Sequence, residues 1–190
     1  MTARVPTEIL TAREAAELVV GAQEVQAAID RTAVRLAVAL EAANPLVLCL
    51  LNGGLPFTAE LIKRFSFPLE LSYLHATRYG QRTSGSQLEW LARPPVSVAG
   101  RHVLLVDDIF DAGETLMQVV EWLRREGAVE VTTAVLVDKA VPRSGAARVD
   151  YAALCCPDRY LFGCGMDFRG YWRNLPAIYA LPRSLEDEAV

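Results

Sequence analysis

The sequence predicts an α/β fold, in which a mostly parallel twisted sheet is flanked by helices. Three observations support this prediction: apolar runs of strand length recur along the chain, helical stretches with one apolar face separate them, and sharp turns follow the strands. Strands and helices that alternate in this way form right-handed βαβ units, which make neighbouring strands parallel. Ligands of such sheets bind at the carboxyl ends of the strands. Candidate functional residues are therefore expected in the turns that follow the strands.

Length, composition and charge limit the class of protein. The 190 residues are expected to form a single domain, 1–190, and 52% hydrophobic residues are enough for a buried core. The formal net charge of −4 gives no electrostatic reason to expect nucleic acid or a membrane as a partner. No apolar run reaches the roughly 18–20 residues of a membrane span, and the N-terminus lacks a signal-peptide pattern. We therefore expect a cytoplasmic protein.

The first forty-odd residues are expected to be helical. Thr11 and Glu14 have the spacing of a capping box, in which the two side chains accept hydrogen bonds from backbone N–H groups at a helix start. The helical pattern ends before the continuous apolar run 46–51, which is typical of a strand buried on both faces. Two glycines predict a sharp turn at 52–54, and Pro56 lies where the next helix would start.

The rest of the chain alternates between strand and helix patterns, with one interruption. Residues 78–100 begin with a polar stretch and end after a proline pair, and long loops in a compact domain are usually lids or disordered segments. We therefore expect a flexible lid there. The other expected elements are strands at 68–76, 102–106 and 129–137, an acidic loop at 107–114, a helix at 115–126, and short strands at 149–155 and 160–163.

The strongest functional signal is the segment HVLLVDDIFDAGETL, in which a buried strand ends in acids and a glycine turn leads into a helix. Asp107 and Asp108 cannot both face the same way at a strand end, so together they can bridge two groups, such as sugar hydroxyls or a Mg²⁺-bound water. Asp111 adds a third acid. Gly113 allows a tight turn, and free N–H groups of the loop and helix start can cradle a phosphate beside the Thr115 hydroxyl.

This segment resembles the phosphoribosyl-pyrophosphate (PRPP) motif of type I phosphoribosyltransferases. Other segments narrow the resemblance to the hypoxanthine-guanine phosphoribosyltransferase family, and they follow the family's order over roughly residues 10–180. They are the segments that resemble the family's pyrophosphate loop (51–57), the start of its lid (79–80), its purine-reading lysine strand (136–139), and its base-stacking and C-terminal loops (157–168 and 173–176).

The resemblance implies a fold, a reaction and an assembly. The fold is that of type I phosphoribosyltransferases, with a small hood formed by the terminal segments, at about 1–20 and 150–190, and the lid at about 78–100. The reaction is purine salvage, in which the 5-phosphoribosyl group of PRPP passes to N9 of hypoxanthine and/or guanine, giving IMP or GMP and pyrophosphate. Mg²⁺ is the implied cofactor, and PRPP and a 6-oxopurine base are the substrates. The family also forms homodimers or homotetramers.

The resemblance also implies roles for individual residues. Asp111 is the implied catalytic residue, near the purine N7. The family also has a cis peptide bond at the position that corresponds to Leu51–Asn52. For PRPP the implied residues are Asp107, Asp108, Ala112, Gly113, Glu114 and Thr115, and for pyrophosphate they are Leu51, Asn52, Gly53, Arg78, Tyr79 and Arg173. For the purine they are Lys139 at O6, Tyr160 stacked on the base and the Leu161 carbonyl, and for the metal they are Asp107, Asp108 and Asp167.

Three positions depart from the family pattern. Asn52 stands where the family usually has Lys or Arg, so a positive charge near pyrophosphate is missing. Arg78 stands where the lid usually has Ser, and it is a candidate to replace that charge. Ala112 stands where the phosphate loop usually has Thr or Ser, which removes a hydroxyl worth about 1 kcal/mol. The chemistry itself depends on none of these groups.

Two alternatives to a hypoxanthine-guanine enzyme stay open. The first is a xanthine-preferring relative, since that choice depends on what faces the purine C2 near Leu161 and Asp167. The second is a non-catalytic regulator of the same fold that senses PRPP or nucleotides. Asp111 and Lys139 favour catalysis, because sensing alone requires neither residue, and the acidic net charge argues against an RNA partner.

The substitution Arg78→Ala tests whether Arg78 replaces the charge missing at Asn52. If it does, the apparent KM for PRPP should rise strongly while the KM for the purine stays almost unchanged, because the guanidinium would contact only pyrophosphate. Steady-state kinetics with each substrate varied in turn measures both constants. Equal effects on the two constants would contradict the hypothesis.

Overall fold

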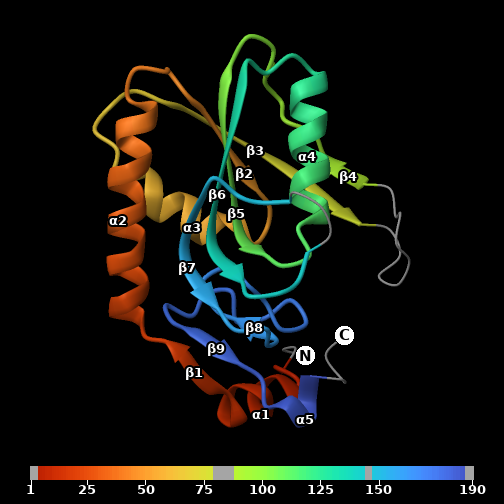
Figure 1. Ribbon diagram of the computed structural model, residues 1–190. Coiled ribbons are helices and arrows are strands. Elements are labelled where there is room, and N and C mark those ends of the chain that lie inside the picture. The colour runs from red at the N-terminus through yellow and green to blue at the C-terminus, as the bar shows by residue number, and fades with distance from the viewer. Residues whose placement is uncertain (1–3, 79–87, 144–146, 187–190) are drawn as a thin grey trace.

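A twisted six-stranded sheet forms the centre of the computed structural model, which describes residues 4–78, 88–143 and 147–186 (Figure 1). Its strand order is β4-β3-β2-β5-β6-β7, and all neighbours are parallel except β4, which runs antiparallel to β3. The predicted mostly parallel sheet is thus confirmed. The strands are β2 (Leu46–Leu50), β3 (Glu70–Arg78), β4 (Leu88–Ala92), β5 (His102–Phe110), β6 (Glu130–Lys139) and β7 (Tyr151–Cys156).

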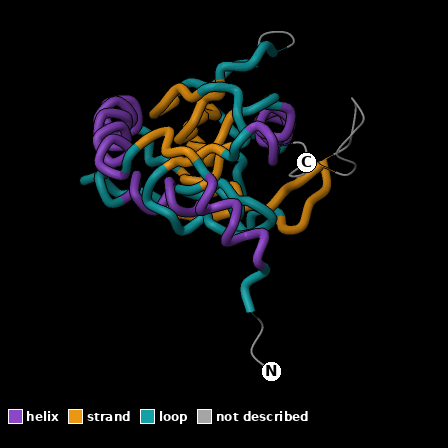
Figure 2. The backbone as a smooth tube through the Cα atoms, turned by 90° about the horizontal axis from the view of Figure 1, so that it is seen from below, coloured by secondary structure: helices purple, strands orange, loops and turns teal. Residues whose placement is uncertain are grey.

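Helices cover both faces of this sheet, because successive strand residues point to opposite sides. Val47 of β2 shares one core with residues of α2 (Ala22–Leu40) and α3 (Gly54–Ile62), whereas its neighbour Leu48 shares a second core with α4 (Glu114–Arg125). Seen from below, the strands accordingly lie between helices on two sides (Figure 2). Among the described residues, no helix combines the length and apolarity that crossing a bilayer requires.

The terminal segments form a hood beyond the carboxyl ends of the parallel strands, at the bottom of Figure 1. Its sheet has three antiparallel strands in the order β1-β9-β8, where β1 is Glu17–Val20, β9 is Ile178–Ala180 and β8 is Leu161–Phe162. The helices α1 (Thr7–Ala15) and α5 (Arg183–Glu186) flank this sheet. The hood therefore combines residues from both ends of the chain.

A small core and one arginine hold the hood together. Ile9 and Phe162 are buried in this core, which is separate from the two cores of the central sheet. Arg159 forms ion pairs with Glu186, at 2.7 Å between Nε and Oε1, and with Glu17, at 3.2 Å between Nη1 and Oε2. This side chain therefore links α5 to β1 just ahead of Tyr160, a predicted purine-binding residue.

The N-terminal region differs from the uninterrupted helical stretch predicted. β1 separates α1 from α2, because it pairs with β9 from the opposite end of the sequence, a contact that local periodicity does not reveal. The predicted capping box is also wrong, since Thr11 and Glu14 lie inside α1, which begins at Thr7. Pro6 precedes this helix, and its fixed φ suits a helix entry without a side-chain cap.

The segment predicted as an acidic loop begins as a strand. β5 continues past Val106 to Phe110 because its pairing with β6 extends as far as Asp138. Asp107 and Asp108 are thus held by strand geometry, and the turn into α4 takes only the three residues 111–113.

Two segments assigned to the lid and the hood belong to the central sheet. Residues 88–92, within the predicted lid, form β4, which is anchored by Trp90 against Trp122 of α4, with ring centroids 4.5 Å apart. Tyr79 and the other residues to position 87 lie outside the described residues, as does the side chain of Arg78. Residues 151–156, placed in the hood, form β7 beside β6, so the C-terminal part of the hood begins after Cys156.

Candidate active site

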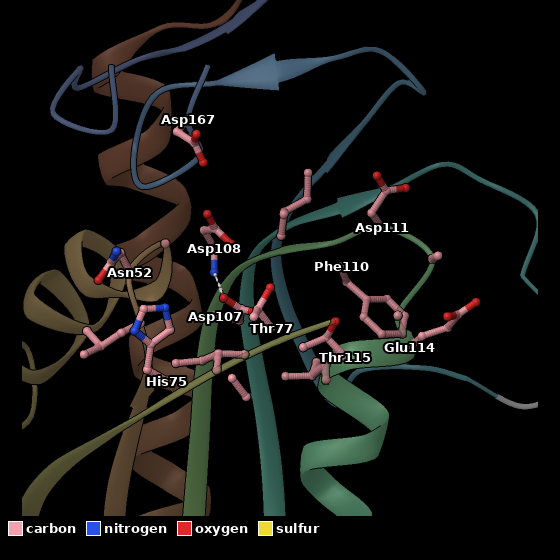
Figure 3. Close-up of a pocket in the computed structure, with 18 of the residues that line it drawn as sticks. Asn52, His75, Thr77, Asp107, Asp108, Phe110, Asp111, Glu114, Thr115 and Asp167 are labelled. Atoms are coloured by element: carbon pink, nitrogen blue, oxygen red, sulfur yellow. Dashed lines mark hydrogen bonds between the residues drawn. The ribbon is translucent and has the colours of Figure 1, made fainter. Parts of the chain in front are cut away.

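Two adjoining cavities lie where the carboxyl ends of the parallel strands meet the hood. The larger cavity, of about 390 Å³, is lined by the ends of β2, β3 and β5, by the start of α4 and by two hood residues (Figure 3). The smaller cavity, of about 200 Å³, lies between the ends of β5 and β6 and the hood. The residues that line both are Asp108, Ile109, Asp111 and Asp167. The arrangement suits a ligand with two chemically different halves.

Two adjacent acids at the end of β5 dominate the larger cavity. Asp107 and Asp108 point in different directions, and the Asp108 N–H donates to Asp107 Oδ1 at 2.9 Å (Figure 3). Burial raises the pKa of both carboxyl groups, and the charge of Asp108 raises that of Asp107 further. Arg173 partly offsets this effect, with its Nη1 3.9 Å from Asp108 Oδ2. The cavity is therefore short of positive charge when no ligand is bound.

The turn between β5 and α4 offers an anion site. Gly113 is the residue before the helix, and its φ of 82° lies in the left-handed region that favours glycine. Ala112, Glu114 and Thr115 line the cavity around it. The first N–H groups of a helix have no partner within the helix, and its dipole favours negative charge. This turn can therefore receive a phosphate, as the sequence predicts.

The turn after β2 approaches β5 so closely that there is no room for a side chain at position 53. The Leu51–Asn52 peptide bond is cis, as predicted. A Cβ added at Gly53 would lie 2.0 Å from Asp108 Oδ2, and one added at Gly165 would lie 2.1 Å from the Gly53 carbonyl oxygen. Glycine at both positions therefore allows the turn, the acidic strand and the hood loop to meet.

Arg173 and Asp167 close the larger cavity from the hood side. Arg173 Nη2 lies 2.5 Å from Asp167 Oδ1, and its Nη1 donates to the Gly165 carbonyl at 2.6 Å. The second Asp167 oxygen accepts from the Gly170 N–H at 2.6 Å. Both carboxylate oxygens of Asp167 therefore have partners within the protein. To act as the predicted metal ligand, Asp167 would have to release one of them.

The smaller cavity contains a lysine held between two carboxylates. The Lys139 side chain is only 10% exposed, and its Nζ lies 3.0 Å from Asp111 Oδ2 and 3.2 Å from Asp158 Oδ1. Tyr160 and Leu161 line the opposite part of this cavity. The Tyr160 hydroxyl donates to the Asp167 carbonyl at 3.2 Å, and burial raises its pKa. The cavity thus offers a cationic donor beside an aromatic ring.

The described residues do not contain a preformed cluster of three or more metal ligands. Asp107 and Asp108 nevertheless suit Mg²⁺, since their excess negative charge is only partly offset. Mg²⁺ usually binds through one or two carboxylates together with substrate phosphates and waters. The donor set therefore fits an ion that binds together with a phosphorylated ligand.

The geometry brings together most of the predicted site and adds residues that the sequence did not indicate. The turn at 51–53, the acids and turn residues of 107–115, and Arg173 line the larger cavity, whereas Lys139, Tyr160 and Leu161 line the smaller one. The additions include His75, Thr77 and Ile109, which line the cavities, and Asp158, which pairs with Lys139. Ile109 and Asp158 lie inside segments that resemble the family but were assigned no role, whereas only the register of the sheet brings His75 and Thr77 to the site.

Comparison with known proteins agrees with this geometry. The chain matches the model of the phosphoribosyl transferase domain family over residues 20–169. It is 31% identical to the hypoxanthine-guanine phosphoribosyltransferase of Bacillus subtilis, over 87% of this chain and 92% of that protein. It is 32% identical to the bifunctional protein TilS/HprT of Listeria innocua over 90% of this chain, but it spans only 27% of the length of that relative.

The fold agrees as well. The crystal structure of a hypoxanthine phosphoribosyltransferase from Staphylococcus aureus superposes with a TM-score of 0.86 and 23% identity, covering 92% of this chain and 96% of that one. At this level of identity the likeness concerns the fold, and it confirms the predicted sheet with its hood. The matched family model and the similarity to the Bacillus protein, which extends over 87% of this chain, show that the chain belongs to the hypoxanthine-guanine phosphoribosyltransferase family.

Proposed function

We propose that the chain catalyses purine salvage, transferring the 5-phosphoribosyl group of PRPP to N9 of hypoxanthine and/or guanine to give IMP or GMP and pyrophosphate. One observation carries the proposal. A cavity with an acidic strand end and a helix start adjoins a second cavity with a buried lysine, and Asp111 borders both. The first suits a phosphorylated sugar, and the second suits a base with an acceptor oxygen.

The larger cavity would hold the PRPP. The turn residues Ala112, Gly113, Glu114 and Thr115 would surround the 5′-phosphate at the start of α4. Asp107 and Asp108 would bind the ribose hydroxyls. Loss of pyrophosphate builds positive charge on the ribose ring, and fixed carboxylates beside the ring stabilise that charge in the transition state.

Pyrophosphate would lie on the opposite side of the same cavity. The turn Leu51–Gly53 offers backbone N–H groups, and Arg173 offers a guanidinium whose fork matches phosphate oxygens. Arg78, at the end of β3, and Tyr79, which follows it in the sequence, are proposed to complete this subsite. Asp107 and Asp108 would hold Mg²⁺, which when bound would supply positive charge beside the leaving group. Asp167 would take part only by giving up its ion pair with Arg173 or its hydrogen bond from the Gly170 N–H.

The smaller cavity would hold the purine. Lys139 would donate to the exocyclic O6, and it would reject adenine, whose amino group cannot accept a hydrogen bond from an ammonium. Tyr160 would stack on the base, and the Leu161 carbonyl would accept from the guanine amino group. O6 would then accept a hydrogen bond from an ammonium that now donates to Asp111 and forms an ion pair with Asp158.

Asp111 would accept a proton in the reaction. As N9 bonds to the anomeric carbon and the bond to the pyrophosphate oxygen breaks, the proton on N7 would pass to the Asp111 carboxylate. Its side chain is 56% exposed and lies 3.0 Å from the Lys139 ammonium, which keeps the carboxylate next to the purine edge. Proton transfer of this kind contributes about 10²–10⁴-fold to the rate.

We further propose that the chain forms a homodimer or a homotetramer. Leu71 and Tyr73 lie on one face of β3 and are 50% and 45% exposed, although β3 is an inner strand of the central sheet. Neighbouring exposed apolar side chains are typical of protein interfaces, and a second copy of the chain would cover them. Light scattering should give two or four times the chain mass of 20.8 kDa, and a monomer would contradict the proposal.

Activity with four bases tests the proposed reaction. With PRPP and Mg²⁺, hypoxanthine or guanine should be converted and adenine should not. Asp111→Asn should lower kcat by about 10²-fold, because the amide cannot accept the N7 proton. Glu121→Gln is the control: it makes the same kind of acid-to-amide change on the exposed side of α4, outside both cavities, and we expect it to leave kcat nearly unchanged.

Other outcomes of this assay would identify the alternatives. Preferential conversion of xanthine would make the chain a xanthine-preferring relative. Failure to convert any base, together with measurable binding of PRPP or nucleotide, would contradict catalysis and favour a regulator.

Replacing Asp107 with Asn should stabilise the ligand-free protein. The amide keeps an oxygen that accepts the Asp108 N–H, but it removes one of two adjacent charges in the cavity. A gain of about 1 kcal/mol is expected, which raises the Tm of a domain of this length by roughly 2–4 °C. Thermal unfolding followed by circular dichroism measures the change, with Glu121→Gln on the exposed side of α4 as control. A Tm at or below that of the unmodified protein would refute the prediction.

A further inference from the structure

Arg143, which follows β6, contacts two segments of the candidate site at once. Its Nε donates to the Asp111 carbonyl at 2.5 Å, and its Nη2 donates to the carbonyls of Phe110 at 2.6 Å and Lys139 at 2.7 Å. The same Nη2 lies 2.7 Å from Asp138 Oδ1. The guanidinium therefore joins the turn that carries Asp111 to the strand end that carries Lys139.

The packing around Arg143 reinforces this connection. Its side chain is only 14% exposed, and its guanidinium lies over the Phe110 ring, 4.3 Å from the ring centroid. The Phe110 ring in turn lies against Gly113, where an added Cβ would be 2.5 Å from Cε2. A continuous line of contacts thus runs from Arg143 through Phe110 to the residue that precedes α4.

We propose that Arg143 is a positioning residue that sets the separation between Asp111 and Lys139, and thereby lets the site contact N7 and O6 of one purine together. The inference rests on the proposed function. Arg143 donates to the backbone carbonyls of Asp111 and Lys139, so its hydrogen bonds leave both side chains available to the purine. Arg143 itself would contact neither substrate.

The chemistry of the side chain supports this role. The guanidinium is planar and always charged, with donors in a fixed fork, so it can bond carbonyls of two segments in one geometry. A lysine ammonium is a compact charge on a flexible stem and cannot reproduce the fork or stack flat on the Phe110 ring. The carbonyls of Phe110 and Asp111 lie where β5 ends, so the arginine supplies donors at that point.

A positioning role predicts different effects on different ligands. The product IMP would contact both the α4 start and Lys139, so its binding depends on how these two parts are spaced. Pyrophosphate would contact the turn Leu51–Gly53 and Arg173 on the other side of the larger cavity. Loss of Arg143 should therefore weaken binding of IMP much more than binding of pyrophosphate, whereas general damage to the fold would weaken both.

The experiment compares Arg143→Ala and Arg143→Lys with the unmodified protein and with Arg148→Ala, an exposed arginine of the same connection between β6 and β7. Calorimetry measures the Kd of IMP and of Mg²⁺-pyrophosphate, and kinetics measures the KM of hypoxanthine. Charge-assisted hydrogen bonds of this kind predict a rise of about tenfold or more in the IMP Kd and the hypoxanthine KM for Arg143→Ala. Arg143→Lys should stay close to Arg143→Ala, and Arg148→Ala should match the unmodified protein.

The outcomes separate this inference from the proposed function. An equal loss of IMP and pyrophosphate binding, an unchanged IMP Kd in Arg143→Ala, or full recovery in Arg143→Lys would each overturn the positioning role. Added guanidinium ion should restore part of the IMP affinity of Arg143→Ala, and a lack of rescue would likewise count against it. If the unmodified protein binds IMP but converts no base, the proposed function fails while the role of Arg143 in nucleotide binding is still measured.

Discussion

The site depends on the close approach of three backbone segments to Asp108. The turn after β2, the end of β5 and the hood loop meet there because Gly53 and Gly165 have no side chains to separate them. A methyl group at either position would overlap a neighbouring oxygen at about 2 Å, so the segments would have to part. The turn that follows β2 and the acids near the end of β5, the neighbouring strand in the sheet, can therefore border a single cavity. Arg173 can close this cavity from the hood side.

This crowding explains the electrostatics of the cavity. Asp107 and Asp108 are consecutive on β5 and lie between the turn after β2 and the hood loop. Burial there raises the pKa of both carboxyl groups. Such an arrangement lowers the stability of the ligand-free protein, but it prepares the cavity for cations and for the positive charge that develops on a sugar. In the adjoining cavity the charges balance differently, because Lys139 already has two carboxylate partners. The larger cavity thus has carboxylates that Arg173 only partly offsets, whereas the smaller cavity has a cation that is already paired with carboxylates.

Local sequence patterns predicted the central sheet and the acidic segment that leads into α4, and the family resemblance supplied the other candidate residues that line the two cavities. Both failed where structure depends on distant partners. The apolar run of β2, the acids of β5 and the turn at Gly113 lie within short segments, so their pattern is readable. β1 was missed because its partner is β9, and the extent of β5 was underestimated because pairing with β6 continues it. Arg143 and Asp158 were missed for the same reason: their partners at positions 110, 111 and 139 are brought to them by the sheet.

The pairing of β1 with β9 also determines when the two halves of the site form. In the central sheet, four of the five strand pairs join consecutive strands, whereas Glu17 of β1 must find Ala180 of β9. Contacts between residues so far apart in sequence require the closure of a long loop, and contacts of this kind slow folding. During synthesis, β1 leaves the ribosome early but remains unpaired until almost the whole domain has followed. The strand end and turn at 107–115 can therefore form before Arg173 and the purine-facing residues of the hood are in place.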